Sequence, residues 1–403
     1  MRCRTFVVAE DIDLNAVCAG DGFLFAQNNF GHAGRNIAAV ANSNDVTSLL
    51  ATIDIAADSA DFSPLAFGLV PFLPSDEAVF FIPQVLFSKD TNGNTFLTLC
   101  GETETDISHA EADRVIAEVQ AAQPPLPQAQ EFTVRPLTPV ETYLQAVTGA
   151  RDAVQRGDIR KAVIARDIAV SSNSPIDIYG VLLRLRASFG SSYRFCIDNM
   201  VGASPELLVE VDGRTVRSRP LAGTTPRTGD PETDARLAEQ LKASEKNQIE
   251  HRVVIDMVHD TLLPHCSYLD WEDEPSIVTV ANVQHLGTYL EGALTEPSPH
   301  ILDLVRALCP TPALGGSPTR EAIDFIVAHE GFARGFYGGA VGWVNADGNG
   351  TFAVTIRCAE LSPDRTTARL FAGGGIVADS EPLAELAETQ SKFQAMLSAI
   401  IRP

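Results

Sequence analysis

Glu250 is a carboxylate in a position where a carboxylate is costly. The segment 244–258 is predicted to form a helix, and at about 100° per residue Glu250 falls within its apolar stripe. The stripe consists of Ile249, Val253, Val254, Met257 and Val258. A buried carboxylate without a counter-charge usually neutralises, pairs with a cation or binds a metal. Taken alone, this helix is more simply explained by a buried pair with an arginine, or by a helix rotated from this register.

A second group of charged side chains lies on the last predicted helix. Glu385, Glu388 and Lys392 fall within about 60° of one another around its axis, away from its apolar stripe. A solvated face with an i,i+4 Glu–Lys pair is the ordinary interpretation. The functional alternative is a divalent cation shared with Glu250. Mg²⁺ suits that role, because it binds a few carboxylates together with water and substrate oxygens.

Lys161 and Glu206 are titratable residues beside apolar neighbours. Lys161 begins the predicted buried strand 161–166, and Glu206 directly precedes the predicted strand 207–211. Desolvation lowers the pKa of a lysine and raises that of a glutamate, which would suit a general base and a general acid respectively. Without other evidence, a strand-end side chain that reaches water is the favoured interpretation of each. His251 and His285 are interpreted as core histidines, because no histidine spacing here indicates a zinc site.

Arg357 and the run Gly373–Gly375 are candidates for binding an anion. If 351–357 is a strand, its even-numbered residues face the core and its odd-numbered residues, ending at Arg357, line the other face. A planar guanidinium fork suits a carboxylate, although a solvent-facing arginine is an equal alternative. Glycines let the backbone approach a ligand, and their N–H groups favour anions. A triple glycine by itself is usually a turn, and the phosphate-loop pattern GxxxxGK[ST] is absent.

The elements that must position these residues are a mixture of helices and antiparallel strands. Asp212-Gly213 and the run 347–350 each separate two strand-like segments, which predicts hairpins at 207–218 and 340–358. The other predicted strands are 78–87, 94–100 and 161–166, and the predicted helices are 140–157, 233–263, 301–308, 318–328 and 382–400. Hairpins indicate antiparallel pairing, so we expect an α+β fold and not a doubly wound parallel sheet.

Three regions follow from the composition along the chain. Residues 1–122 form an N-terminal α+β part, the proline-rich stretch 123–137 is interpreted as an extended connector, and 138–403 carries the motifs. The 403 residues include 30 Lys and Arg against 52 Asp and Glu, a formal charge of −22. So negative a surface repels nucleic acid and anionic membranes, and neither is expected as a partner. An anionic substrate would need a locally positive pocket.

Cysteine usage and the N-terminus predict a cytoplasmic protein. The seven cysteines are scattered without CxxC pairs, which favours buried thiols over disulfides or zinc ligands. No signal-peptide core and no apolar run long enough to span a membrane is found.

Read together, these segments resemble the chorismate-utilising enzymes, and among them the isochorismate synthases most closely. The resemblance covers roughly residues 138–400, and its motifs occur in the order of that family. They are IRKAVIAR (159–166), GASPELL (202–208), PLAGT (220–224), SEK to Glu250-His251 (244–251), QHLGT (284–288), PTPALGG (310–316), FYGGAVG (336–342), TIR (355–357) and AGGGIV (372–377) leading into ELAET (385–389).

The resemblance implies two intertwined α+β halves with large antiparallel sheets and a magnesium site. In such enzymes the positions of Glu250 and Glu388 hold Mg²⁺, and that of Glu385 contributes through water. The ion would bind the ring carboxylate of chorismate. The substrate-binding positions implied are Gly223, Thr224, His285, Ala313, Leu314, Tyr337, Arg357, Gly373, Gly375 and Lys392.

The implied reaction is the isomerisation of chorismate to isochorismate. Neutral Lys161 would take a proton from the water that attacks C2, and protonated Glu206 would donate a proton to the departing C4 hydroxyl. The product would feed siderophore, salicylate or menaquinone synthesis. No partner domain is fused, so we expect a monomer. Asn247 departs from the family, many members of which carry an acid there, and we therefore expect an altered outer metal shell.

Three alternatives stay open. A salicylate synthase would also eliminate pyruvate, but such relatives tend to carry Thr where this chain has Ala313. Anthranilate or aminodeoxychorismate synthase uses ammonia, and those relatives usually carry Gln at the position of Lys161. A non-catalytic homologue would bind chorismate without turnover, which the complete set of acid, base and metal residues disfavours.

Overall fold

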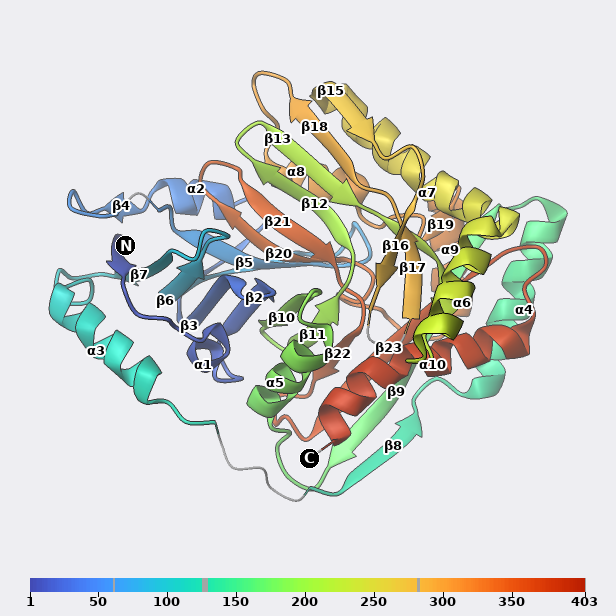
Figure 1. The fold of residues 1–403 in the computed structure, drawn as a ribbon, viewed down its shortest axis with the longest axis horizontal. Helices are drawn as coiled ribbons and strands as arrows, with labels where there is room; N and C mark the ends of the chain where they lie inside the picture. The colour runs from blue at the N-terminus through green and yellow to red at the C-terminus, as the bar shows by residue number, and fades with distance from the viewer. Residues whose placement is uncertain (61, 125–129, 281–282, 403) are drawn as a thin grey trace.

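Long antiparallel strands form the centre of the molecule, with helices packed around them (Figure 1). The computed structural model describes residues 1–60, 62–124, 130–280 and 283–402. Within these residues, continuous pairing joins 20 strands into one large sheet, and three further strands form a smaller one. Pairing is antiparallel throughout except between β1 and β4. The predicted α+β class is confirmed.

The first third of the chain supplies seven strands and three helices. They are β1 (Arg2–Val8), α1 (Leu14–Cys18), β2 (Phe23–Gln27), β3 (Phe30–Asn42), α2 (Val46–Ala51), β4 (Asp54–Ile55), β5 (Leu65–Val70), β6 (Val79–Lys89), β7 (Thr95–Gly101) and α3 (His109–Ala121).

The middle of the chain alternates strands and helices. Its elements are β8 (Phe132–Pro136), α4 (Val140–Arg156), β9 (Lys161–Ser172), α5 (Ile178–Phe189), β10 (Tyr193–Ile197), β11 (Met200–Ser204), β12 (Leu207–Asp212), β13 (Thr215–Arg219), β14 (Leu221–Pro226), α6 (Pro231–Ala243), α7 (Glu245–Leu262) and a short 3₁₀ turn (Leu263–His265).

The last part completes both sheets. Its elements are β15 (Cys266–Trp271), β16 (Ser276–Thr279), β17 (Val283–Gly287), β18 (Leu290–Leu294), α8 (Ile301–Leu308), β19 (Gly316–Ser317), α9 (Thr319–His329), β20 (Ala340–Asn345), β21 (Gly350–Val354), β22 (Cys358–Leu361), β23 (Thr367–Ile376) and α10 (Pro382–Ile401).

Strands from the two ends of the chain are interleaved. β2 pairs with β10, and β5 pairs with β20, so residues 1–122 share one sheet with the later strands. The longest pairing in the second half joins β9 to β23, from Ala162 opposite Ile376 to Ser171 opposite Thr367. α10 crosses these two strands, and α6 and α7 pack against β14 of the small sheet (Figure 1).

Both predicted hairpins are present, because β12 pairs with β13 and β20 pairs with β21. Three local predictions are wrong. The predicted helix 233–263 is two helices that meet at Ser244, whose backbone is extended and whose hydroxyl accepts the N–H of Asn247 at 3.4 Å to cap α7. A hydroxyl that caps a helix N-terminus favours a new helix over continuation of the previous one.

The strand predicted to carry Arg357 ends earlier than expected. β21 stops at Val354, and Arg357 has φ of 52°, in the left-handed region that non-glycine residues rarely adopt. The strict alternation of two faces therefore does not reach Arg357, and Ile356, predicted to face the core, lies on the wall of the same cavity as Arg357.

The register of α7 also differs from the prediction. The side chain of Ile249 is 61% exposed, while His251, Val254, Ile255, Val258 and Leu262 are buried. The apolar face is rotated away from Ile249, and Glu250 lies at its edge instead of at its centre.

The proline-rich stretch is partly a strand. β8 pairs with β9 from Phe132 opposite Ser172 to Pro136 opposite Ile168, so this part lies along the body of the fold. Residues 125–129 of the predicted connector lie outside the described residues.

The expectation that all cysteines are free thiols is wrong for two of them. Cys3 and Cys100 form a disulfide, and they face each other directly in the pairing of β1 with β7. Because the two cysteines are 97 residues apart in the chain, the sequence does not indicate that they are neighbours. The other five cysteines are free.

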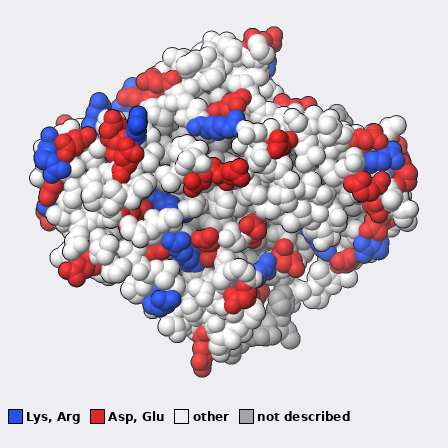
Figure 2. Space-filling view, turned by 180° about the vertical axis from the view of Figure 1, so that it is seen from behind, with Lys and Arg blue, Asp and Glu red and all other residues white. Residues whose placement is uncertain are grey.

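Charged side chains are dispersed over the face seen in Figure 2. Lys and Arg there occur singly or beside Asp and Glu, without an extended basic patch among the described residues of that face. Within the described part of the chain, no helix is long and apolar enough to cross a membrane.

The disulfide predicts a specific thiol count. Unreduced, denatured protein should show five reactive thiols among its seven cysteines. C3S should raise the count to six by freeing Cys100, and should lower the free energy of unfolding by about 2–4 kcal/mol, because the bond constrains a long loop of the unfolded chain. Titration with a thiol reagent and denaturant unfolding measure both effects. C266S is the control and should lower the count to four; seven thiols in the unreduced protein would contradict the bond.

Candidate active site

A cavity of about 330 Å³ lies where α7 and α10 meet β9, β14, β17 and β23. All fifteen residues singled out from the sequence line its wall. They are Lys161, Glu206, Gly223, Thr224, Glu250, His285, Ala313, Leu314, Tyr337, Arg357, Gly373, Gly375, Glu385, Glu388 and Lys392. The fold thus brings together residues that are up to 231 positions apart in the chain, from 161 to 392.

The counter-charge of Glu250 is a lysine and not the arginine considered from the sequence. Lys161 Nζ lies 2.6 Å from Glu250 Oε1, and the two side chains are only 7% and 20% exposed. Lys161 projects from the first position of β9, and Glu250 projects from the second turn of α7. At this burial the attraction between them is screened far less than at the surface.

Glu388 and Lys392 pair along one face of α10. Lys392 Nζ lies 2.6 Å from Glu388 Oε1 and donates a hydrogen bond of 2.7 Å to the carbonyl of Gly373. Burial by itself would raise the pKa of Glu388, but the charge and hydrogen bond of Lys392, together with the charges of Arg357 and Lys246, outweigh burial, and the net effect is a lowered pKa. Burial, with a smaller contribution from the charge of Glu388, raises the pKa of the neighbouring Glu385.

The glycines of β23 make room for these carboxylates. A Cβ at Gly375 would lie 2.5 Å from Lys161 Cε and 2.9 Å from Glu250 Oε1, and one at Gly374 would lie 2.8 Å from Glu385 Oε2. β22 pairs with β23 only as far as Leu370. Beyond Leu370, one edge of β23 pairs with β9 and the other edge faces the cavity. The carbonyl of Gly373 points from this free edge to Lys392. Because alternate residues of a strand point the same way, the N–H of Gly375 is also directed to that edge.

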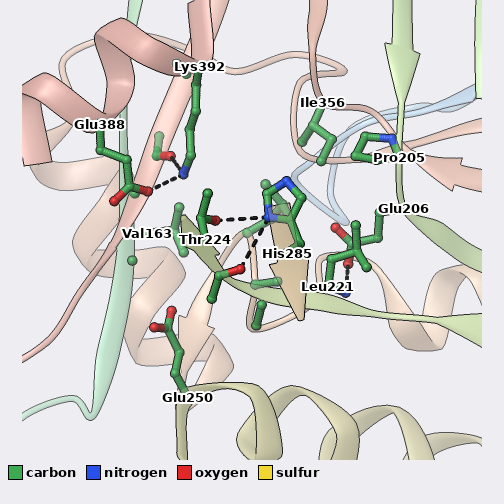
Figure 3. A pocket seen from close by; sticks show the side chains of 18 of the residues that line it. Val163, Pro205, Glu206, Leu221, Thr224, Glu250, His285, Ile356, Glu388 and Lys392 are labelled. Carbon is green, nitrogen blue, oxygen red and sulfur yellow. Dashed lines mark hydrogen bonds and ion pairs between the residues drawn. The ribbon is translucent and has the colours of Figure 1, made fainter. Parts of the chain in front are cut away.

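Glu206 occupies a different environment. It lies between β11 and β12 and is 3% exposed, and its Oε1 accepts the N–H of Leu221 at 3.3 Å (Figure 3). Burial raises the pKa of Glu206 to about 8, against smaller opposing effects of the Leu221 N–H and the Lys161 charge. Its carboxyl group is therefore mainly protonated at neutral pH and can donate a proton.

His285 connects the small sheet to Arg357. Its Nδ1 lies 3.0 Å from Thr224 Oγ1 and 3.3 Å from the carbonyl of Gly223 (Figure 3). Its Nε2 lies 3.4 Å from Arg357 Nη2. A guanidinium can only donate, so Nε2 accepts and the proton of the neutral ring is on Nδ1. Burial, followed by the charges of Arg357 and Lys392, lowers the pKa of His285 to about 3. The ring is thus a neutral group that orients Arg357.

Local backbone geometry places Thr224 opposite His285. The pairing of β14 with β17 shifts register between Ala222 and Thr224, and Gly223 between them has φ of 78°. A bulge of this kind re-aims the side chain that follows it, and glycine adopts the required φ without strain.

Tyr337, Ala313 and Leu314 complete the wall. The ring of Tyr337 stacks on Phe371 of β23 with centroids 4.9 Å apart, which fixes its position, and burial raises the pKa of its hydroxyl. Ala313 and Leu314 lie between α8 and β19 and contribute apolar surface beside these polar groups.

Comparison with known proteins agrees with this constellation. The pattern of the family described as chorismate binding enzyme matches residues 26–401, which is nearly the whole chain. The chain belongs to the chorismate-binding enzyme family.

Several members of the chorismate-binding family are close relatives. A protein of Mycobacterium tuberculosis, provisionally named isochorismate synthase MenF, is 41% identical over 68% of this chain and 77% of its own length. Isochorismate synthase DhbC of Bacillus subtilis is 39% identical over 67% of this chain and 70% of its own length. A crystal structure from Bacillus anthracis, provisionally assigned as a 2,3-dihydroxybenzoate-specific isochorismate synthase, is 31% identical, covers 96% of this chain and 98% of its own, and superposes with a TM-score of 0.80. These likenesses confirm the fold expected from the resemblance.

The carboxylates fit the divalent cation implied for this family. Glu250 reaches the cavity from α7 and Glu388 from α10 (Figure 3). Each lies 2.6 Å from an ammonium group. No three His, Cys, Asp or Glu side chains in the described ranges form a ready metal cluster. Mg²⁺ does not require one, because it is usually bound through one or two carboxylates with water and substrate oxygens completing its shell. The donors present thus suit Mg²⁺ better than a metal that needs a closed protein cage.

Two charged or polar neighbours of the cavity were not predicted as site residues. Lys246 lines the wall one helical turn before Glu250, and this i,i+4 spacing on α7 was the available signal. Asn247, singled out only as a departure from the family, also lines it and donates from Nδ2 to Ser244 Oγ at 2.8 Å. Apolar wall residues such as Val163 and Phe371 could not be predicted as site residues, because their hydrophobicity indicates only burial.

The cavity is locally positive in a protein of charge −22. When Lys161 is protonated in its pair with Glu250, four cationic side chains among the described residues line it: Lys161, Lys246, Arg357 and Lys392. With Glu206 protonated, at most three charged carboxylates face them: Glu250, Glu385 and Glu388. The positive balance meets the requirement for a pocket that attracts an anionic substrate.

The raised pKa of Glu206 predicts a pH dependence of stability. Between the ordinary pKa of 4.5 and the folded value of about 8, the folded protein holds a proton that the unfolded chain has lost. The stability contributed by this group is therefore fully present below pH 4.5 and is lost as pH rises through 8. E206Q removes the effect, so the melting temperature of the wild type should fall relative to E206Q between pH 5 and 8. E239Q, on the exposed surface of α6, controls for a lost carboxylate; a wild-type–E206Q difference that does not change with pH would contradict the assignment.

Proposed function

We propose that this chain is an isochorismate synthase that converts chorismate to isochorismate. One observation carries the proposal: the Lys161 amine and a buried Glu206, whose pKa is raised by burial, line one locally positive cavity. The names of the relatives from Mycobacterium tuberculosis and Bacillus subtilis support the same reaction.

Lys161 acts as the general base. To act, the amine must first give up the proton that it holds in its pair with Glu250; it then accepts a proton from a water molecule as the water oxygen bonds to C2 of chorismate. Lys161 lies at the start of β9, beside Gly375 of β23. Because Gly375 has no side chain, the amine of Lys161 can lie close to the backbone of β23 at the cavity wall. Lys161 at this position distinguishes the chain from ammonia-using relatives, which usually carry Gln there.

Glu206 acts as the general acid. Its proton passes to the C4 hydroxyl as the C4–O bond breaks, and the ring double bonds shift so that the departing water balances the one that entered. Burial supplies the required protonation state at neutral pH, while Glu388 in the same cavity stays ionised beside Lys392. Environments that separate the pKa values of two carboxyl groups in this way assign them different roles.

The two carboxylates of chorismate are held by different groups. Arg357, oriented by His285, together with Lys392 and the N–H of Gly375, binds the enolpyruvyl carboxylate, with Tyr337 beside them. Mg²⁺, held by Glu250 and Glu388 and through water by Glu385, would neutralise and anchor the ring carboxylate. The enzyme works as a monomer, since one chain supplies every residue of this set, and it is proposed to act in the cytoplasm. Its product would enter siderophore, salicylate or menaquinone synthesis.

Proton NMR of purified protein with chorismate tests the reaction and its metal requirement. With Mg²⁺ we expect the signals of isochorismate without pyruvate, and with EDTA no turnover, because the ring carboxylate would lose its anchor. Stoichiometric pyruvate would instead indicate a salicylate synthase, and an aminated product on addition of ammonia would indicate an anthranilate or aminodeoxychorismate synthase. Binding of chorismate without turnover would indicate a non-catalytic homologue.

K161A tests the base. Turnover should fall by at least about 10²–10⁴-fold, because no other group takes the proton from water. Circular dichroism and the melting temperature should show that the fold is kept. K242A, an exposed lysine of α6, is the matched control and should keep wild-type turnover. Activity of K161A near that of K242A would remove Lys161 from the mechanism.

A further inference from the structure

Arg334 and Glu330 form a buried ion pair just outside the cavity. Arg334 Nε donates to Glu330 Oε2 at 2.7 Å and Arg334 Nη2 donates to Glu330 Oε1 at 2.6 Å. The side chains are 2% and 1% exposed, and neither residue lines the cavity. Removing two charges from water is costly, so a buried ion pair often contributes little to the stability of the fold. The other contacts of this pair indicate a different role.

The pair fills a gap in the hydrogen bonding of β9. On the edge of β9 away from β23, β19 pairs with Lys161 and Ala162, and β8 pairs only from Ile168 onward. Between them, the carbonyl of Val163 accepts from Arg334 Nη2 at 2.7 Å, and the N–H of Ala165 donates to Glu330 Oε1 at 2.6 Å. Two side chains thus continue the ladder where no strand is present, directly after Lys161.

The same guanidinium holds two further segments of the cavity wall. Arg334 Nη1 donates to the carbonyl of Leu314 at 2.8 Å. The carbonyl of Arg334 accepts the N–H of Tyr337 at 3.0 Å, and its guanidinium lies 5.7 Å from the Tyr337 ring centroid. On its other side the guanidinium lies over Phe72, 4.2 Å from the ring centroid. One side chain therefore connects the strand of Lys161, the Ala313-Leu314 segment and Tyr337.

We propose that Arg334, fixed by Glu330, is a positioning residue that sets the distance between the base strand and the substrate-binding segments at Leu314 and Tyr337. This rests on the proposed function, because it assigns a purpose to the spacing of the same site. A displacement of about 1 Å between reacting groups can cost on the order of 100-fold in rate. The Arg334 guanidinium is packed on Phe72 and makes four hydrogen bonds. The segments that it joins cannot shift by that distance while all four hydrogen bonds are kept.

Arginine is required here by the number and direction of its donors. Four of its five N–H groups have acceptors in three directions: both oxygens of Glu330, and the carbonyls of Val163 and Leu314. A lysine has the charge, but a single ammonium cannot reach three separate acceptors in this planar arrangement. R334K therefore keeps the charge balance but loses the hydrogen bonds that fix the distance between β9 and the segments at Leu314 and Tyr337.

The experiment compares R334K and E330Q with the wild type and with R114K. Arg114 forms an exposed i,i+4 pair with Glu118 on α3, outside the cavity, and provides a matched arginine-to-lysine control. E330Q keeps an acceptor for the Ala165 N–H but removes the counter-charge of Arg334, whereas R334K keeps the charge pair but loses donors, so the two variants disturb different parts of the same contact. For each variant, circular dichroism gives the folded fraction, isothermal titration gives the Kd for chorismate, and steady-state kinetics with Mg²⁺ give KM and kcat.

Loss of positioning should raise KM and Kd by about tenfold and lower kcat by about 10–100-fold in R334K, with a smaller change in E330Q. A purely structural role would lower the folded fraction and hence the apparent kcat, but it would leave KM and Kd unchanged. Wild-type KM and Kd in both variants, whatever their apparent kcat, would overturn the proposal. Absence of turnover in the wild type would refute the isochorismate synthase activity alone, and the Kd comparison would still decide the role of Arg334.

Discussion

The ion pair between Lys161 and Glu250 is the interaction on which the rest of the site depends. It joins the first residue of β9 to α7, and it lies against Gly375 of β23, where a side chain would collide with both partners. The long pairing of β9 with β23 and the packing of α7 on β14 therefore bring Lys161 and Glu250 into contact. An uncompensated ammonium or carboxylate at the same depth would be costly.

The arrangement of charges in the cavity explains how carboxyl groups a short distance apart can differ in protonation. Glu250 and Glu388 each have a lysine at 2.6 Å, whereas Glu206 has only a backbone N–H at 3.3 Å. Burial raises the pKa of both Glu206 and Glu388; the neighbouring cations outweigh burial at Glu388, whereas the smaller effects of the Leu221 N–H and the Lys161 charge do not outweigh it at Glu206. The same cations give an acidic protein a pocket for an anion.

Groups outside the cavity hold those inside it. Arg357 adopts a left-handed backbone conformation that is unfavourable for its residue type, and the carbonyl of Arg357 is held by the N–H of Ala203 at 3.1 Å. Such a conformation persists where the surrounding structure over-determines it, and it is found most often at functional sites. His285 and Arg334 act in a comparable way, since each fixes a segment of the wall through hydrogen bonds.

The sequence by itself determined the elements whose signals are local, and the identity of the residues in the cavity. Helix α4 between Pro139 and Gly157 and the hairpin at Asp212-Gly213 follow from neighbouring residues. The ordered motifs that carry Lys161, Glu250 and Arg357 indicated the cavity residues through their resemblance to a known family. Only the tertiary structure decided that Lys161 is the partner of Glu250, that Cys3 meets Cys100, that Ile249 faces outward and that Arg357 lies beyond the end of its strand. Propensity and periodicity act over a few residues, whereas these contacts arise from strand pairings and helix packing between distant segments, whose register no local pattern specifies.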